Sequence, residues 1–401
     1  MPQGQRGFVV AKGAQHTARH KKSCSCAGFT EKDVAKYIHG AGGLARAQLM
    51  CKKRSSISRG ATALLCFQQK RMLMSILVCG GAGYIGSHNV RVLLARGEDV
   101  VVVDNFLTGH RASLPDGVNL YEGDIRDGAL LDQVFSSHRV DAVLHFAASS
   151  LVSESMEQPL KYFHNNVHGM QTLLEAMVRN RVDKIVFSSS AAVYGEQESV
   201  PINEDAPLHP TNPYGESKLI MERMMHWVGK AHGIRFVSLR YFNVGGAWPG
   251  GAIGEAHNPE SHLIPLILQV PLGRRDVVTI FGNDYPTPDG TCIRDYLDIM
   301  DLADAHMRAL DYLRTGGGSE ICNLGNGKGF SVREMVAAAC RVTGHDIGVT
   351  LATRRYGDPA RLVASADRAR EILGWQARAG IDQIIASAWD WHKTHPDGFS
   401  S

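Results

Sequence analysis

The stretch that decides the fold reads Ser75-Ile-Leu-Val-Cys-Gly-Gly-Ala-Gly-Tyr-Ile-Gly86. Its first five residues are a short apolar run, as in a buried strand. The glycines that follow permit a tight turn and a close approach of the backbone to a phosphate, and a helical pattern then runs from about 85 to 96 before Gly97. This order of strand, glycine-rich turn and helix is typical of dinucleotide binding, with a pyrophosphate at the helix amino terminus.

Strands and helices continue to alternate after this unit. Further apolar strands are expected at 99–103, 140–145, 184–187 and 235–240, with a helix at 214–232 before the last of them. The alternation implies a parallel sheet with right-handed crossovers. After Asn243 the rhythm gives way to a loop rich in Gly and Pro, short elements and a helix near 381–392. We therefore expect an α/β fold: a Rossmann-type doubly wound domain over 74–244 and a smaller carboxyl-terminal α/β lobe over 245–401.

The first 73 residues differ from the rest in composition. They hold 14 Lys and Arg but only two acids, Glu31 and Asp33, whereas the remainder holds 29 basic and 38 acidic residues. This segment is either a targeting sequence or translated upstream sequence, and we favour the second because Met72 and Met74 stand just before the first strand. The segment is expected to be disordered. No nucleic acid partner is expected, because the body of the chain is acidic.

Two further classes of protein are disfavoured by composition. No apolar run reaches the roughly 18 residues that a membrane helix needs, so no membrane association is expected. The four cysteines of the body are scattered, which indicates free thiols in a reducing compartment and a cytoplasmic location. Cys24 and Cys26 are too close together for the usual zinc spacing, so no metal site is expected.

An acidic residue follows the second predicted strand. Asp104 stands 18 residues beyond Gly86, where a carboxylate can accept hydrogen bonds from a ribose 2′-hydroxyl and would repel a 2′-phosphate. The cofactor predicted is therefore NAD rather than NADP. Asp124, in the next strand-and-loop segment, either meets the adenine edge or is an ordinary loop carboxylate, and its spacing leaves both open.

Tyr214 and Lys218 stand four residues apart at the start of a predicted helix, so they share one face. A tyrosine has a pKa near 10, but an adjacent ammonium favours the phenolate and makes it a usable base. Tyr214 can then take the proton from a hydroxyl while hydride leaves carbon. Ser190, at the end of a predicted strand, supplies a hydroxyl for the same oxygen.

Together these residues resemble the extended short-chain dehydrogenase/reductase superfamily, and within it the UDP-glucose 4-epimerase family over about 74–399. The motifs that carry the resemblance are Gly80-Gly-Ala-Gly-Tyr-Ile-Gly-Ser-His88, Val103-Asp-Asn105, Gly123-Asp-Ile-Arg126, His145-Phe-Ala-Ala148, Asn165-Asn-Val167, Phe187-Ser-Ser-Ser-Ala-Ala-Val-Tyr-Gly195, Asn212-Pro-Tyr-Gly-Glu-Ser-Lys218, Arg240-Tyr-Phe-Asn243, Phe281-Gly-Asn-Asp-Tyr285, Ile293-Arg-Asp-Tyr296, Asn323-Leu-Gly325 and Arg354-Arg-Tyr-Gly-Asp358. The blocks at Phe281 and Arg294 are the most specific to this group.

The resemblance implies interconversion of UDP-glucose and UDP-galactose through a 4-keto sugar, by transient hydride transfer to tightly bound NAD. It also implies a homodimer. The cofactor-binding residues that it implies are Gly80, Gly83, Tyr84, Ile85, Gly86, Asp104, Asn105, Asp124, Ile125, Phe146, Ala147, Asn165 and Lys218. The substrate-binding residues that it implies are Ser190, Tyr214, Tyr241, Asn243, His262, Leu263, Phe281, Arg294, Arg355 and Asp358.

Three residues depart from the pattern of some family members. Ser150 replaces a lysine near the cofactor, His262 replaces an asparagine beside the pyrophosphate, and Leu362 replaces a bulky aromatic residue at the sugar pocket. A smaller wall at Leu362 leaves UDP-N-acetylglucosamine open as an alternative substrate, and UDP-glucuronate is a second alternative. A nucleotide-sugar 4,6-dehydratase is disfavoured because Ala191 and Ala192 stand where similar dehydratases have acids. A non-catalytic NAD sensor is disfavoured because Tyr214 and Lys218 are both present.

Overall fold

The computed structural model describes residues 74–355 and 358–399. The predictions for residues 1–73, and the two central residues of the Arg354–Asp358 motif, lie outside this part of the chain. None of the helices in the described residues combines the length and the apolarity that crossing a membrane requires.

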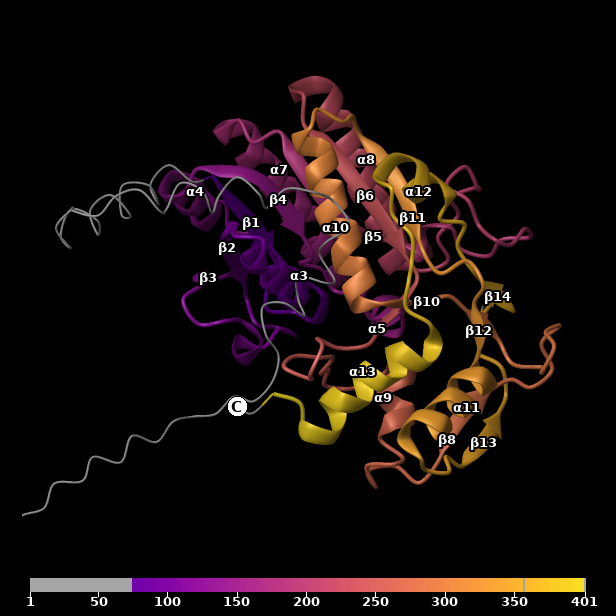
Figure 1. Cartoon of the computed structure of the whole chain (residues 1–401). Coiled ribbons are helices and arrows are strands. Elements are labelled where there is room, and N and C mark those ends of the chain that lie inside the picture. Colours follow the sequence, from indigo (N-terminus) through magenta and orange to yellow (C-terminus); the bar gives the residue numbers. More distant parts are fainter. Residues whose placement is uncertain (1–73, 356–357, 400–401) are drawn as a thin grey trace, which may run out of the picture. The chain divides into compact units, whose positions relative to one another are not determined.

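A seven-stranded parallel sheet forms the larger layer of the described chain, with strand order β11-β6-β5-β4-β1-β2-β3 (Figure 1). Its strands are β1 (Ser75–Cys79), β2 (Asp99–Asp104), β3 (Asn119–Glu122), β4 (Val140–His145), β5 (Lys184–Ser190), β6 (Arg235–Tyr241) and β11 (Glu320–Leu324). The order from β3 to β6 is that of a doubly wound dinucleotide-binding sheet. The predicted fold class is confirmed.

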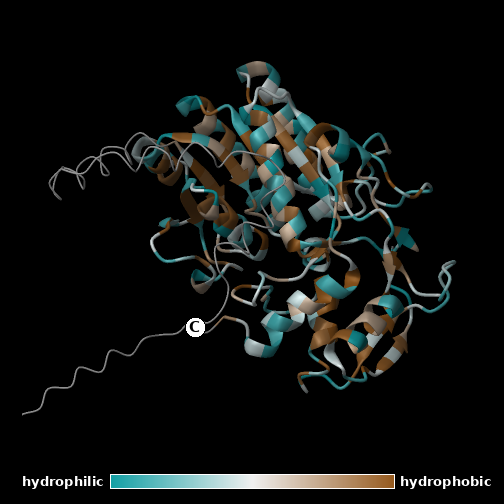
Figure 2. Ribbon diagram, viewed as in Figure 1, coloured by the Kyte–Doolittle hydropathy of each residue, from teal (hydrophilic) through white to brown (hydrophobic). Residues whose placement is uncertain are grey.

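Both faces of the sheet are covered by helices. Along β1, Ile76 and Val78 belong to one apolar core, shared with α3, α10 and α12, while Leu77 and Cys79 belong to another, shared with α4, α7 and α8. Successive side chains of a strand point to opposite faces, so a strand covered on both sides has to be apolar throughout. In Figure 2 the strands are accordingly coloured as hydrophobic, whereas the helices carry both kinds of residue. These helices are α3 (Tyr84–Ala95), α4 (Gly128–Ser137), α7 (Gly169–Asn180), α8 (Pro213–His232), α10 (Ile299–Arg314) and α12 (Asp367–Leu373).

Shorter elements connect β4 to α7 and β5 to α8. The chain passes through α5 (Val152–Glu157), α6 (Pro159–Tyr162) and a π-helical turn, η2 (Phe163–His168), before α7. A 3₁₀ turn, η3 (Ala191–Val193), follows β5, and another, η1 (Arg111–Ser113), follows β2. These connections lie where the sheet strands end, so they border the site described below.

A third apolar core joins α9, α11 and α13 with β8, and these elements lie together at one end of the sheet (Figure 1). Its elements and the small strands beside it are β7 (Asn243–Gly245), α9 (Leu263–Leu268), β8 (Val278–Phe281), β9 (Ile293–Arg294), β10 (Tyr296–Asp298), β12 (Phe330–Ser331), α11 (Val332–Thr343), β13 (Val349–Ala352), β14 (Arg361–Leu362) and α13 (Ile381–Thr394). However, α10 and β11 also come from the segment predicted as a separate lobe, 245–401, and they join the large sheet. The domain boundary at residue 244 stays a prediction.

Strand β5 is longer than its apolar pattern indicates. The sequence predicts its end at Phe187, but pairing with β6 continues to Ser190, which lies beside Tyr241. Ser188 and Ser189 are buried, and the Ser189 hydroxyl donates a hydrogen bond of 2.6 Å to the carboxylate of Glu222. A buried partner for the hydroxyl therefore lets serine continue the strand beyond its apolar run.

We predict that Leu131→Ala lowers the free energy of unfolding by about 2–5 kcal/mol, because Leu131 is fully buried on α4 and its loss leaves a cavity. Leu160→Ala is the matched control: its side chain is 80% exposed, and the change should be within about 0.5 kcal/mol. Urea unfolding of both variants measures this, and equal losses would contradict the assignment of the core.

Candidate active site

A cavity of about 490 Å³ opens where the carboxyl ends of the sheet strands meet the segments around 255–265 and 358–362. Ligands of doubly wound sheets bind at this edge, between strands whose connections run in opposite directions. The cavity brings together fourteen residues predicted for the site: Gly80, Gly83, Tyr84, Ile85, Gly86, Phe146, Ser190, Tyr214, Lys218, Tyr241, Asn243, His262, Leu263 and Asp358.

Gly80 and Gly86, at the two ends of the turn after β1, have no space for a side chain. A Cβ atom at Gly80 would lie 2.6 Å from the backbone nitrogen of Ala147, and Gly80 has a positive φ of 79°. A Cβ atom at Gly86 would lie 2.0 Å from the Gly80 carbonyl oxygen. The turn therefore brings bare backbone to the cavity, beside the start of α3, whose first N–H groups have no partner within the helix. This combination suits a pyrophosphate.

Asp104 ends β2 and holds the glycine turn. Its two carboxylate oxygens accept hydrogen bonds of 2.8 Å from the backbone N–H groups of Ala82 and Phe106. Burial raises the pKa of Asp104, and these two N–H groups act in the opposite direction. Each oxygen has a second lone pair, so the carboxylate can still accept a ribose hydroxyl.

Asn105 and Asp124 lie beside each other at the ends of β2 and β3 but do not line the cavity. The Asn105 amide donates to Asp124 at 2.9 Å, and Arg126 binds both carboxylate oxygens of Asp124. These hydrogen bonds, above all those from Arg126, lower the pKa of Asp124 to about 2. An ordinary loop ion pair thus accounts for Asp124, and its contact with the cofactor stays a prediction.

Three other residues predicted to bind the cofactor are placed away from the cavity lining. Ile125 is buried in the apolar core between the sheet and α4 and α7. The backbone N–H of Ala147 donates to the Cys79 carbonyl at 3.0 Å, which holds the loop after β4 against β1. The Asn165 amide donates to the side chain of its neighbour Asn166 at 3.1 Å. Contacts of these three residues with the cofactor, through side chain or backbone, stay predictions.

Tyr214 and Lys218 lie on the first turns of α8 and face the end of β5. The helix begins at Pro213, and the Asn212 side chain caps it by accepting a 2.9 Å hydrogen bond from the Gly215 N–H. The Lys218 ammonium donates to the Ser188 carbonyl at 2.7 Å and lies 5.9 Å from the centre of the Tyr214 ring. Tyr214, Lys218 and Ser190 therefore share one cavity, as the spacing predicts.

Burial changes the acidity of both groups. It raises the pKa of Tyr214, while a hydrogen bond with the Ser190 side chain acts in the opposite direction. It lowers the pKa of Lys218 to about 7, although the charge of Glu222 opposes this. A lysine that is only 3% exposed can thus change its charge near neutral pH, next to a tyrosine whose proton affinity depends on that charge.

A buried ion pair behind Lys218 fixes α8 to the sheet. Glu222 is one turn after Lys218, and its carboxylate accepts from Arg240 at 2.6 and 3.0 Å. Both side chains are at most 4% exposed. Arg240 also donates to the Tyr194 hydroxyl at 2.9 Å, and that hydroxyl donates to Asn323 on β11 at 2.7 Å. The network joins α8, β6 and β11 to the residue that follows η3. In the sequence, Tyr214, Lys218 and Glu222 share a helical spacing, but this spacing does not indicate partners on other strands.

The residues predicted to bind UDP fall into two groups, those that line the cavity and those that do not. Asn243, His262, Leu263 and Asp358 line the cavity, as do Tyr241 and the variable positions Ser150 and Leu362. The remaining three, Phe281, Arg294 and Arg355, are not among the residues that line the cavity. Arg294 forms an ion pair with Asp358, and the Arg355 guanidinium lies 4.1 Å from the centre of the Phe281 ring. Because Asp358 is a lining residue, its partner Arg294 is adjacent to the cavity.

The family model for the NAD dependent epimerase/dehydratase family matches residues 76–325 of this chain. The chain belongs to that family. The UDP-glucose 4-epimerase of Lacticaseibacillus casei is 57% identical over 327 residues, which are 81% of this chain and 99% of the relative. The resemblance to UDP-glucose 4-epimerases is thereby confirmed.

Solved structures agree with this family. The UDP-glucose 4-epimerase of Brucella ovis, solved in complex with NAD, is 46% identical with a TM-score of 0.77 and covers 79% of this chain and 97% of its own. That of Bifidobacterium longum, solved with NAD+ and UDP, is 39% identical with a TM-score of 0.77 and covers 81% of this chain and 100% of its own.

We predict that Glu222→Gln destabilises this family member by about 3–5 kcal/mol, because Arg240 would stay buried without a counter-charge. Glu216→Gln, a partly exposed position on the same helix, is the control. Urea unfolding measures both. A surface ion pair contributes up to about 1 kcal/mol of stability. A loss below about 1 kcal/mol for Glu222→Gln would therefore contradict the role assigned to the network.

We also predict that Lys218→Met gains stability relative to the unmodified chain as the pH falls. Burial holds the folded-state pKa of Lys218 at about 7, below its ordinary 10.5. Between these two values the unfolded chain binds a proton that the folded chain does not, so this lysine destabilises the fold progressively from pH 10.5 down to pH 7, and the effect then levels off. Unfolding free energies of both proteins across this window test the sign, and a difference independent of pH would contradict it.

Proposed function

We propose that this chain is a UDP-glucose 4-epimerase, which interconverts UDP-glucose and UDP-galactose through a 4-keto sugar while NAD stays bound. The observation that carries the proposal is that Tyr214, Lys218 and Ser190 line the same cavity as the glycine turn of β1. Relatives that are 55–57% identical carry this name. The alternative substrates, UDP-N-acetylglucosamine and UDP-glucuronate, are not favoured for the same reason.

The residues present fit NAD. Gly80, Gly83 and Gly86 leave only backbone beside the start of α3, which suits the pyrophosphate, and Asp104 would accept from the adenosine ribose. A 2′-phosphate would meet this buried carboxylate, which supports NAD over NADP. When bound, NAD supplies a reversible acceptor for the hydride of the sugar C4 carbon.

The side chains of the protein remove and return the proton of the 4-hydroxyl. Tyr214 would accept this proton as the sugar is oxidised and return it as the sugar is reduced on its other face. The Ser190 side chain, which opposes the rise in the pKa of Tyr214, lines the same cavity and would bond to the same sugar oxygen. The Lys218 ammonium uses one of its three N–H donors on the Ser188 carbonyl, which leaves two for other partners and holds its charge beside Tyr214. That charge favours the phenolate.

Inversion at C4 needs a firm hold on UDP and a loose hold on the sugar, so that the keto sugar can turn over. We assign the hold on UDP to the group around Asp358: Asn243, His262, Leu263, Phe281, Arg294 and Arg355. Arginines suit a diphosphate because they form charge-assisted hydrogen bonds with it. The homodimer and the cytoplasmic location expected from the sequence belong to this proposal as well.

We predict that Tyr214→Phe lowers the rate of UDP-galactose formation by about 10²–10⁴-fold, the usual contribution of a general acid–base. Tyr121→Phe is the control. Tyr121 is on β3 and does not line the cavity, and its hydroxyl bonds to His138 at 3.0 Å. Proton NMR of UDP-glucose incubated with each protein, with no added oxidant, follows the anomeric signal of the product. An unchanged rate in Tyr214→Phe would refute the role of Tyr214, and no product from the unmodified chain would refute the function.

A further inference from the structure

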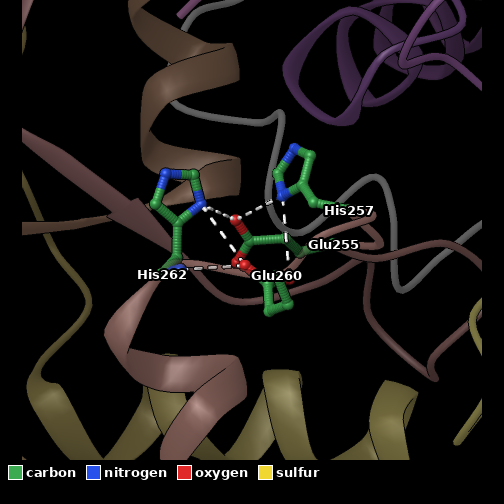
Figure 3. Close-up of side chains that lie close together, drawn as sticks. All are labelled: Glu255, His257, Glu260 and His262. Carbon is green, nitrogen blue, oxygen red and sulfur yellow. Dashed lines mark hydrogen bonds and ion pairs between the residues drawn. The ribbon is translucent and has the colours of Figure 1, made fainter. Parts of the chain in front are cut away.

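Two carboxylates and two imidazoles gather in the loop between β7 and α9. Glu255, His257, Glu260 and His262 each direct one ligand atom toward the others, and these four atoms all lie within 4.8 Å of one another (Figure 3). We call this set the Glu/His cluster. Three of its members, all except Glu260, also line the cavity described above.

The spacing of the ligand atoms is that of a metal site. His257 Nδ1 lies 3.3 Å from Glu255 Oε1 and 3.7 Å from Glu260 Oε2, whereas His262 Nδ1 lies 3.9 Å from the other Glu260 oxygen, Oε1. Ligands at about 2.0–2.2 Å from a tetrahedral zinc ion are about 3.3–3.6 Å apart. His262 Nδ1 and Glu255 Oε1 are hydrogen-bonded at 2.5 Å, so the His262 ring has to turn away from Glu255 before both atoms can bind one ion.

A buried nitrogen in the Glu/His cluster has no hydrogen-bond partner. His257 Nδ1 is covered from solvent and points at the carboxylates of Glu255 and Glu260, yet it makes no hydrogen bond of acceptable geometry (Figure 3). Leaving such an atom without a partner costs about 1–3 kcal/mol, so it calls for an explanation. An ion between this nitrogen and the two carboxylates would supply the missing partner.

The loop is held in place by contacts outside the Glu/His cluster. The buried Trp391 side chain donates to the Glu255 carbonyl at 3.0 Å, and His110 bonds to the Ala256 carbonyl at 3.0 Å. One oxygen of Glu260 accepts the backbone N–H groups of Ser261 and His262 at 2.8 and 2.9 Å, which orients its other oxygen toward His257. Outer contacts of this kind fix the ligands of metal sites.

We propose that Glu255, His257, Glu260 and His262 bind one divalent transition-metal ion, with Zn²⁺ the best match. Imidazole nitrogens combined with carboxylate oxygens suit zinc and its neighbours, whereas Ca²⁺ and Mg²⁺ favour sets made of oxygen alone. The two carboxylates balance the charge of the ion. The expectation of no metal rests on the cysteines alone, but the sequence also holds a signal for metal ligands, Glu-x-His-x-x-Glu-x-His at 255–262.

The position of the Glu/His cluster also lets the ion contact the substrate. An ion there faces the cavity beside His262 and Leu263, the residues assigned to the diphosphate of the substrate, and it can accept an anionic oxygen as an additional ligand. This contact rests on the proposed function, whereas binding of the ion does not.

The test compares three full-length proteins, each stripped with a chelator, loaded with Zn²⁺ and desalted before metal analysis. These are the unmodified chain, the double variant His257→Gln/Glu260→Gln, and the control double variant His345→Gln/Glu371→Gln, which makes the same changes at exposed positions elsewhere. The unmodified chain and the control should retain one more equivalent of zinc than the cluster variant. Equal zinc contents in all three would overturn the proposal.

If the cluster variant does not fold, Co²⁺ binding to the unmodified chain tests the metal site instead. Co²⁺ added to the stripped, unmodified chain should give the intense visible bands of a tetrahedral nitrogen and oxygen site, and one equivalent of Zn²⁺ should abolish them. The weak spectrum of the hydrated ion would overturn the proposal and mean that the four side chains hold one another by protons alone. Conversion of UDP-glucose, followed separately by NMR, tells whether the proposed function or the metal site has failed.

Discussion

Strand β1 pairs in parallel with β2 on one side and with β4 on the other, so the chain leaves these strands in opposite directions and a crevice remains at their carboxyl ends. The turn after β1 has to pass directly beside the backbone at Ala147, where a Cβ atom on Gly80 would come within 2.6 Å. The glycine turn, the carboxylate of Asp104 and the start of α3 are all placed by this one constraint. The cavity lies in the crevice that these three features border.

The acid–base chemistry depends on a second layer behind the cavity. Helix α8 carries Tyr214 and Lys218, and the buried pair of Glu222 and Arg240 fixes that helix to β6. Burial raises the pKa of Tyr214 and lowers that of Lys218 to about 7, so the lysine can change its charge near neutral pH beside the tyrosine. At a solvated pair with the same spacing, water would screen the effect of the lysine charge on the tyrosine.

The sequence predicts the local parts well and the long-range parts poorly. Strands β1 and β4 begin and end where their apolar runs do, and the four-residue spacing places Tyr214 and Lys218 on one face. Nothing local indicates that β11 pairs with β6, because that choice depends on packing across the sheet. The same holds for the contact between Arg294 and Asp358 and for the Glu/His cluster, whose loop conformation depends on Trp391.

In the proposed mechanism the C4 hydrogen of the sugar leaves as hydride and returns to the same carbon within the cavity. UDP-glucose deuterated at C4, incubated with the unmodified chain in ordinary water and followed by NMR, tests this. We expect UDP-galactose that keeps its deuterium at C4. Replacement of that deuterium by a solvent proton would contradict it, because C4 would then be inverted by proton removal from carbon.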